Sequence, residues 1–156
     1  MFLHLLTLSE IKKCYQDNLL QHFPANEMRR LESIENLYSQ GIYSGYAYFL
    51  DQQLVAYAFC VYHKAHGVYL LDYYAVMPSH RRMGIGGQFL SQLIQTFNAK
   101  GLLIEVKTPS DHLSQEENTT RQSRISFYEQ NGARLTAIGG DVFGIHFTLM
   151  YYPSSV

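Results

Sequence analysis

The sequence predicts an α/β fold in which a mixed central sheet of about six to seven strands is flanked by about four helices. Apolar runs of strand length alternate along the chain with segments whose apolar residues recur at helical spacing. The clearest junction lies within residues 70–90, where an apolar and aromatic run meets Pro78 and a glycine-rich turn before a helical pattern begins. The sequence shows no internal repeat or linker, so residues 1–156 are expected to form one domain.

Composition places the chain among globular proteins, because 47% of its 156 residues are hydrophobic and 16% are charged. A net charge of −1 gives no reason to expect nucleic-acid binding. Cys14 and Cys60 lie far apart and form no C-x-x-C pattern, so neither a disulfide framework nor a metal site is predicted. Residues 1–6 lack the basic leader of a secretion signal, and no apolar stretch approaches membrane-spanning length. A cytoplasmic location without membrane contact is therefore expected.

The first part of the chain predicts one strand and two helices. Residues 2–6 form a short apolar run that favours an edge strand. A helix is expected over residues 9–22 with Ser9 as its cap, since the Phe-Pro pair that follows breaks helices. A second helix is expected over residues 26–40 with Asn26 as its cap.

The middle of the chain predicts most of the sheet. Residues 45–50 and 54–62 read as the two strands of a hairpin, and a further strand begins at Val68. Residues 102–106 are almost entirely apolar and predict a buried strand. Between these strands lies a helix whose apolar residues share one face, namely Leu90, Leu93, Ile94 and Phe97.

The last part predicts a loop, a helix and a hairpin. Residues 108–118 are polar and are expected to form a loop, after which Thr119 or Thr120 opens a helix that continues to Gln130. Two strands, at 133–138 and 145–151, complete the chain. The glycine-rich residues 139–141 are the expected hairpin turn between them.

The turn between the strand from Val68 and its helix carries two arginines and three glycines, which are Arg81, Arg82, Gly84, Gly86 and Gly87. Glycines allow a backbone to approach a ligand closely, and a helix N-terminus directs free N–H groups at anions. The arginines add fixed positive charge and forked donors. This combination predicts a pyrophosphate-binding turn.

Two common phosphate-binding patterns do not fit this turn. It lacks the Lys-Ser/Thr pair of a Walker A motif and the G-x-G-x-x-G spacing of a dinucleotide fold. It contains instead Arg81-x-x-Gly84-x-Gly86, preceded by Ala75-Val76-x-Pro78. This pattern resembles the acetyl-CoA signature of the GNAT N-acetyltransferase superfamily, and the order of expected elements matches that family along nearly the whole chain.

The resemblance implies a GNAT fold, acetyl-CoA as co-substrate and no metal. It implies that the backbone of the signature strand contacts the pantetheine arm and the thioester carbonyl. It also implies that the turn holds the pyrophosphate. The cofactor-binding residues expected on this basis are Ala75, Val76, Met77, Arg81, Arg82, Met83, Gly84, Ile85, Gly86 and Gly87.

Residues 121–133 carry a second resemblance, to the late helix of the same family. Tyr128 matches the family's general acid, which protonates the departing thiolate; the alternative is a core tyrosine with a bonded hydroxyl. Phe127 is expected to pack inward so that Tyr128 faces the cleft. The chain departs from the family at Arg121, where many members carry a pantetheine-binding Asn, and at Ala133, where they carry Phe.

The general base is not directly implied. Tyr73 stands where many members of the family carry a glutamate, and strand alternation is expected to point Asp72 to the opposite face of the sheet. Glu105, on a neighbouring strand among apolar residues, is the candidate base, with a salt-bridged strand residue and a water chain as alternatives. By family analogy the segment 22–27 borders the acceptor cleft. Glu27 would then attract a cationic amine, unless it lies on a solvated face, and Tyr73 is the other candidate acceptor contact.

The resemblance thus implies an N-acetyltransferase that acts on a primary amine of a small molecule or peptide by direct attack. The alternative is a non-catalytic CoA-binding regulatory or interaction module, which the missing strand glutamate favours and the retained Tyr128 region disfavours. Self-association as a homodimer is left open, and the sequence does not name the acceptor.

Overall fold

The structure is a computed structural model that describes residues 2–97, 99–142 and 144–153. Within these residues seven strands form one mixed sheet in the order β1-β2-β3-β4-β5-β7-β6. Neighbouring strands are antiparallel except β4 and β5, which run parallel. The strands are β1 (Phe2–Leu5), β2 (Tyr43–Leu50), β3 (Gln53–His63), β4 (Val68–Val76), β5 (Gly101–Lys107), β6 (Arg134–Val142) and β7 (Ile145–Pro153).

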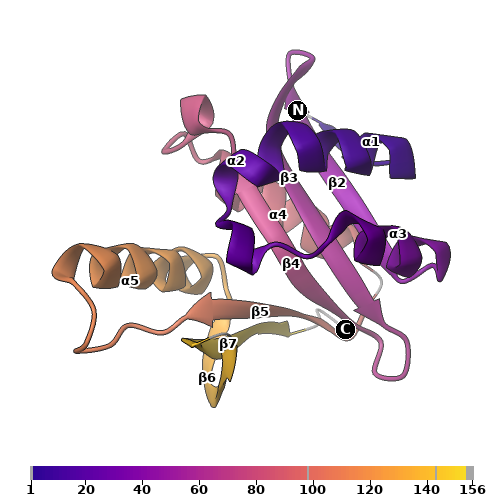
Figure 1. Cartoon of the computed structure of the whole chain (residues 1–156). Helices are drawn as coiled ribbons and strands as arrows, with labels where there is room; N and C mark the ends of the chain where they lie inside the picture. Colours follow the sequence, from indigo (N-terminus) through magenta and orange to yellow (C-terminus); the bar gives the residue numbers. More distant parts are fainter. Residues whose placement is uncertain (1, 98, 143, 154–156) are drawn as a thin grey trace.

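Helices cover both faces of this sheet (Figure 1). On one face lie α1 (Leu8–Cys14), a π-helical turn (Tyr15–Leu19), α2 (Leu20–His22), a 3-10 turn (Ala25–Glu27) and α3 (Leu31–Ser39). On the other lie α4 (Ile85–Thr96), which follows a 3-10 turn (Pro78–His80), and α5 (Gln115–Gln130). The predicted α/β fold with a mixed sheet and the predicted order of strands and helices are confirmed, and β1 is an edge strand as expected.

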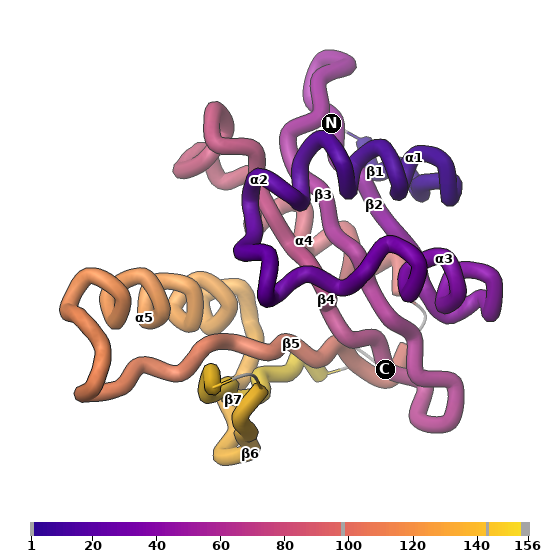
Figure 2. The backbone as a smooth tube through the Cα atoms, viewed as in Figure 1, coloured from indigo at the N-terminus to yellow at the C-terminus, as the bar shows by residue number. Residues whose placement is uncertain are grey.

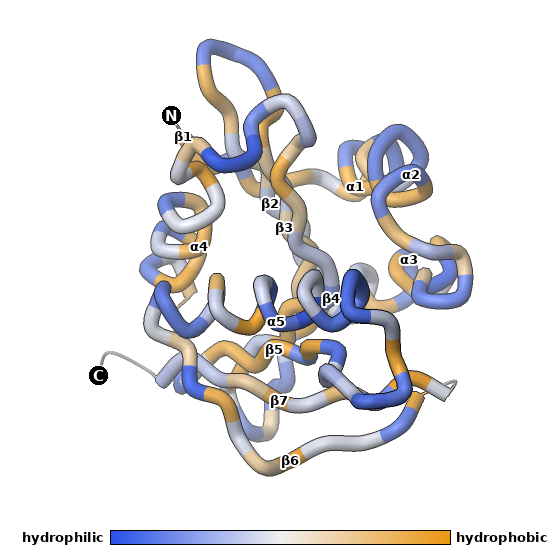
Figure 3. The backbone as a smooth tube through the Cα atoms, turned by 90° about the vertical axis from the view of Figure 1, so that its left-hand side faces the viewer, coloured by the Kyte–Doolittle hydropathy of each residue, from blue (hydrophilic) through white to orange (hydrophobic). Residues whose placement is uncertain are grey.

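Each face of the sheet has its own hydrophobic core. The core under α1 and α3 is centred on Ile11, Leu19 and Ile34, which have no exposed side-chain surface. The core under α4 and α5 includes Phe89, Leu90, Leu93, Ile125 and Tyr128. Phe89 was not among the apolar positions expected for its helix, although it is fully buried there. Most of α5 is polar, as Figure 3 shows, so few of its side chains contribute to the core.

Three predicted helix starts were wrong, and capping side chains explain two of them. Thr7, not Ser9, caps the first helix, because its Oγ1 accepts from the Glu10 N–H at 3.2 Å and Glu10 Oε1 accepts from the Thr7 N–H at 3.0 Å. Ser114 caps α5 through the Glu117 N–H at 3.1 Å, so the helix begins at Gln115, earlier than the expected Thr119 or Thr120.

The third concerns the expected helix from Asn26. Residues Ala25–Glu27 form only a 3-10 turn, and α3 begins at Leu31. The Tyr73 hydroxyl accepts from the Arg29 N–H at 2.6 Å and donates to the Glu27 carbonyl at 3.2 Å. These bonds to β4 take the place of helical ones, so the segment stays extended across the sheet.

The prediction of a hairpin turn at residues 139–141 was also wrong. β6 continues through these residues to Val142, with Gly139 paired with Thr148 and Asp141 with His146. The residues between Leu135 and Gly139 depart from regular pairing, which adds length to β6 relative to β7.

Candidate active site

β4 and β5 lie together at one end and diverge at the other (Figure 2). They pair only from Val68 with Gly101 to Leu71 with Ile104. Beyond this point β5 continues to pair with β7, and β4 continues to pair with β3 up to Val76. The last residues of β4 therefore have no strand partner on the β5 side within the described structure. Their free edge can pair with an extended ligand.

A β-bulge coincides with the parting. Phe59 of β3 is opposite Tyr73, but its neighbour Cys60 is opposite Leu71, so Asp72 is the extra residue. A bulge changes which face the following residues occupy. Leu71 packs under α4 and α5, whereas Tyr73 packs under α1 and α3.

This bulge makes one expectation wrong. Asp72 does not point away from Tyr73: both side chains lie on the α1–α3 face, where Asp72 meets Arg29 and Tyr43. Strict alternation would have separated them, and the extra residue cancels that alternation.

The turn after β4 ends in a helix N-terminus with free donors. Gly84 caps α4 at φ +76°, and Arg82 also has a positive φ of 63°. In the described part of the chain, the N–H groups of Ile85, Gly86 and Gly87 have no acceptor, and the first helical bond is Gln88 N–H to Gly84 O at 3.2 Å. Such a group of donors favours an anion.

The remaining signature residues lie around these donors. Arg81, Arg82 and Met83 are exposed, and Arg81 Nε donates to the Val76 carbonyl at 3.2 Å. The Tyr74 hydroxyl donates to the Gly86 carbonyl and ties the turn to β4. The unpaired edge of β4 thus leads directly into a turn that carries two arginines and three free N–H groups. This arrangement fits a ligand with an extended arm and a pyrophosphate.

A groove of about 730 Å³ runs along one side of α5. Its lining includes residues at helical spacing on that helix, namely Gln115, Asn118, Thr119, Gln122, Ser123, Ser126, Phe127 and Gln130. A Cβ placed on Gly86 would lie 3.2 Å from the Phe127 ring, so the groove ends beside the free N–H groups of α4. The same contact means that valine at position 86 would collide with Phe127, and it would therefore disturb packing as well as ligand binding.

Neither Phe127 nor Tyr128 is placed as expected. Phe127 is half-buried and lines the α5 groove, whereas Tyr128 is only 6% exposed and packs in the core under α4 and α5. Its ring meets Tyr74 and Phe127 edge-on, at centroid distances of 6.3 and 5.1 Å. Within the described residues its hydroxyl makes no hydrogen bond. Burial raises the pKa of Tyr128 to about 12, an effect that the Arg124 charge opposes, so the hydroxyl keeps its proton at neutral pH.

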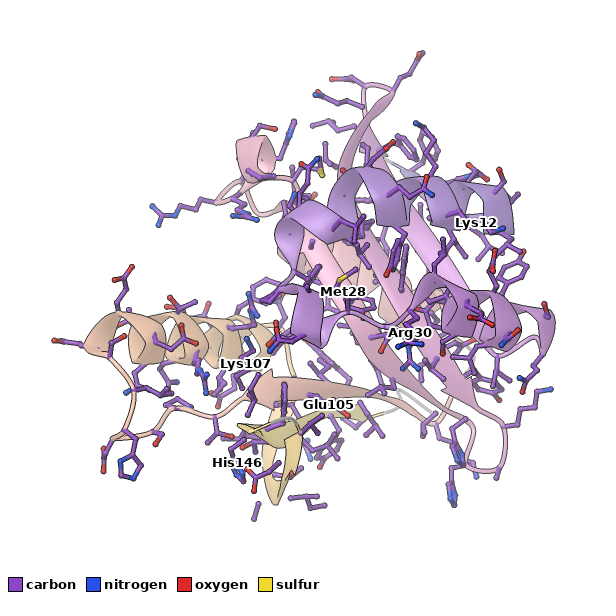
Figure 4. The ribbon with its side chains drawn as sticks, viewed as in Figure 1. Lys12, Met28, Arg30, Glu105, Lys107 and His146 are labelled. Atoms are coloured by element: carbon purple, nitrogen blue, oxygen red, sulfur yellow. The ribbon has the colours of Figure 1, made fainter. Side chains whose placement is uncertain are left out.

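A second cavity, of about 370 Å³, opens on the α1–α3 side of the parted strands; we call it the charged pocket. It is lined by the segment 23–29, β4, β5, Arg124 of α5 and the β6–β7 hairpin. It brings together Glu27, Tyr73 and Glu105, which sequence reasoning had assigned separately to acceptor binding and to the base. Figure 4 shows Glu105 and Lys107 on β5, with Met28 on the facing segment.

Two ion pairs shape the wall of the charged pocket. Glu27 pairs with Lys107, and their side chains are 17% and 24% exposed. Arg29 binds Asp72 in a fork, Nε to Oδ2 at 2.9 Å and Nη2 to Oδ1 at 3.1 Å. Glu27 is thus neutralised by Lys107, and the Tyr73 hydroxyl is already bonded to the 23–29 segment. Glu27 and Tyr73 thus line the pocket and also fix the 23–29 segment in place.

Glu105 is placed differently from the expectation. It is exposed at the pocket, so the prediction that it is embedded among apolar side chains is wrong. Its apolar sequence neighbours Ile104 and Val106 are buried on the opposite face of β5. In the described part of the chain, the Glu105 carboxylate has no ion pair or hydrogen bond.

Sequence reasoning missed three charged residues of this pocket, Arg29, Lys107 and Arg124, and it placed a fourth, Asp72, on the wrong face of the sheet. The only local signal was Asp72 beside Tyr73 in an otherwise apolar strand. Arg124 lies one helical turn before Tyr128, a spacing that would have placed both on one face of α5.

The residues that the structure describes contain no cluster of three or more His, Cys, Asp or Glu side chains placed to hold a metal ion. None of their helices is long and apolar enough to cross a membrane.

Comparisons with known proteins agree with this geometry. The family model described as the acetyltransferase (GNAT) family matches residues 8–132. No curated protein sequence matches significantly. Many solved structures share the fold. A chain from Bacteroides thetaiotaomicron assigned to the GNAT family aligns with a TM-score of 0.77 at 21% identity, over 98% of this chain and 87% of that one.

Two further structures have named acceptors. The ribosomal-protein-S18-alanine N-acetyltransferase of Escherichia coli aligns with a TM-score of 0.70 at 18% identity, over 99% and 94% of the two chains. The aminoglycoside 6'-N-acetyltransferase of Enterococcus faecium aligns with a TM-score of 0.73 at 15% identity, over 100% and 98%. At these identities the likeness establishes the fold, and the acceptors belong to those proteins.

Proposed function

Because this chain belongs to the GNAT family of acetyltransferases, we propose that it transfers the acetyl group of acetyl-CoA to a primary amine of a small molecule or peptide by direct attack. We propose further that residues 1–156 act as a single domain. The observation that carries the proposal is the parting of β4 from β5 at Asp72, with the glycine-arginine turn at the far end of the free edge. The charged pocket is lined by both parted strands, and the α5 groove ends at Phe127, beside Gly86 of the turn.

In this proposal the free edge of β4, from Tyr74 through Ala75 and Val76 to Met77, pairs with the pantetheine arm. The N–H groups of Ile85, Gly86 and Gly87, with Arg81 and Arg82, hold the pyrophosphate. A solved aminoglycoside 6'-N-acetyltransferase of the same fold is described in complex with coenzyme A, which supports this choice of co-substrate. When bound, acetyl-CoA supplies an acetyl group activated as a thioester.

The charged pocket then receives the amine. The new bond joins the amine nitrogen to the acetyl carbon, and the carbon–sulfur bond of the thioester breaks. The Glu105 carboxylate, which is exposed there and free of partners in the described structure, accepts a proton from the amine. The Tyr128 hydroxyl donates a proton to the departing sulfur. The pocket is already shaped by its own ion pairs, so little reorganisation is needed on binding.

Two measurements test the proposal. Calorimetry with CoA measures binding at the turn, and thiol release with mass spectrometry measures transfer from acetyl-CoA to a panel of amines. CoA binding together with an acetylated amine supports the enzyme. CoA binding without transfer to any amine would support the non-catalytic module instead, and absence of CoA binding would contradict the site.

Replacing Arg81 with alanine is expected to weaken CoA binding by about tenfold, because a charge-assisted contact to phosphate is lost. The affinity should also depend less steeply on salt concentration. The melting temperature should stay unchanged, since Arg81 is exposed. Arg134→Ala is the matched control, because Arg134 is an exposed arginine on β6 that lines neither cavity. Equal affinity in the two variants would remove Arg81 from the site.

Replacing Glu105 with glutamine is expected to lower turnover by about tenfold. The loss is modest because Glu105 is exposed, so water can accept the proton in its place. The acidic limb of the pH–rate profile should disappear, while CoA affinity and thermal stability stay the same. A profile that keeps its acidic limb would show that water or another group takes the proton.

A further inference from the structure

The charged pocket has no formal net charge, although it is lined with charged groups. Three acidic side chains, Glu27, Asp72 and Glu105, are balanced by three basic ones, Arg29, Lys107 and Arg124. A pocket built for an acceptor with several amines would carry an excess of negative charge, because complementary potential selects the ligand. The composition of this pocket therefore disfavours a polycation.

Four of the six charges are already used within the protein. Glu27 pairs with Lys107, and Arg29 forms its fork with Asp72. These pairs hold the 23–29 segment against β4 and β5. A ligand would have to displace an ion pair to reach any of them, which costs the energy of the pair.

The other two charges are available to a ligand. Within the described residues neither Glu105 nor Arg124 takes part in an ion pair or hydrogen bond. Both are exposed, and they reach the pocket from different elements, Glu105 from β5 and Arg124 from α5. Arg124 also lies one helical turn before Tyr128, the proposed acid, on α5. The pocket thus offers a ligand one charge of each sign.

Resting on the proposed function, we infer that the acceptor amine also carries an acidic group, a carboxylate or a phosphate, which Arg124 binds while the ammonium meets Glu105. A guanidinium binds either group through two parallel hydrogen bonds, which fixes orientation as well as adding affinity. The acidic group would therefore direct the amine nitrogen toward the thioester. This acceptor class differs from the spermidine and aminoglycosides named for neighbours of the same fold.

The experiment compares acceptors that differ only in the acidic group. The pairs are phosphoethanolamine against ethanolamine, β-alanine against ethylamine, and lysine against 1,5-diaminopentane, with spermidine as a polycation. Thiol release from acetyl-CoA gives kcat and KM for each. The acidic member of at least one pair is expected to have a kcat/KM at least about tenfold higher, mainly through a lower KM. The phosphate and carboxylate pairs show which acid is preferred.

Arg124→Gln should abolish this preference by raising KM for the acidic acceptors alone, and Arg124→Lys should restore part of it. Arg134→Gln, which removes one arginine from β6 away from both cavities, should retain the preference. If Arg124→Gln lowered kcat/KM equally for all acceptors, Arg124 would act at the reacting atoms, and the inference would be overturned. Efficient acetylation of spermidine or of the acid-free amines would overturn it too, while leaving the proposed function intact. CoA binding with no amine acetylated would overturn both.

Discussion

Tyr128→Phe is expected to lower turnover by about a hundredfold to ten-thousandfold while CoA affinity and thermal stability barely change. The substitution removes only the hydroxyl that we propose as the general acid. The ring and its edge-on contacts with Tyr74 and Phe127 remain. Since the hydroxyl makes no hydrogen bond within the described residues, its removal leaves no buried partner unsatisfied.

The protonation state supports the same expectation. Burial raises the pKa of Tyr128 to about 12, so the group is protonated at every pH at which the enzyme would be assayed. No limb of the pH–rate profile near neutrality should therefore come from Tyr128. In the proposed mechanism, Tyr128 still holds the proton that the departing thiolate requires.

Tyr152→Phe is the matched control for this change. The Tyr152 hydroxyl donates to the Tyr128 carbonyl at 3.2 Å, so its loss should cost about 1 kcal/mol of stability and leave turnover within a few-fold of the parent. Steady-state kinetics and thermal melts separate the two cases. Normal turnover in Tyr128→Phe would show that Tyr128 serves only in core packing, and the acid would lie elsewhere.

Asp72→Ala is expected to destabilise the fold by about 3 kcal/mol, because it leaves a partly buried guanidinium without its counter-charge. The Asp72 and Arg29 side chains are 13% and 32% exposed, and the Tyr43 hydroxyl donates to the same carboxylate at 2.8 Å. Removing the carboxylate thus leaves three donors unsatisfied, two of Arg29 and one of Tyr43. The 23–29 segment should loosen with Arg29, so KM for the amine should rise more than the affinity for CoA falls.

Urea denaturation measures the loss of stability in Asp72→Ala, and Asp17→Ala is the control variant. Asp17, in the π-helical turn, pairs with Lys13 of α1, and the side chains are 54% and 79% exposed, so its removal should leave stability nearly unchanged. Asp72→Asn keeps an acceptor for Tyr43 and should fall between the two. Equal stability of Asp72→Ala and Asp17→Ala would show that the fork is not a structural element of the pocket.

The sequence by itself determined the features that depend on neighbours along the chain. Alternation and helical spacing predicted the strands and most of the helices, and the element order indicated the family. The turn from Arg81 to Gly87 was recognisable because its chemistry is local: positive φ at Gly84 and free N–H groups at a helix start need only adjacent residues. How this turn contacts CoA stays a prediction.

Only the tertiary structure decided which charged groups share the charged pocket. Asp72 and Tyr73 share a face because β4 has one extra residue, a β-bulge, where it pairs with β3. A bulge depends on how two strands pair and not on either strand alone. The helix expected from Asn26 is replaced by bonds to Tyr73, some 45 positions along the chain. Glu27 contacts Lys107, and Arg124 lines the pocket, because the tertiary structure brings their elements together. Such contacts join residues distant in sequence, so no local pattern encodes them, and they determine which charges remain free for an acceptor.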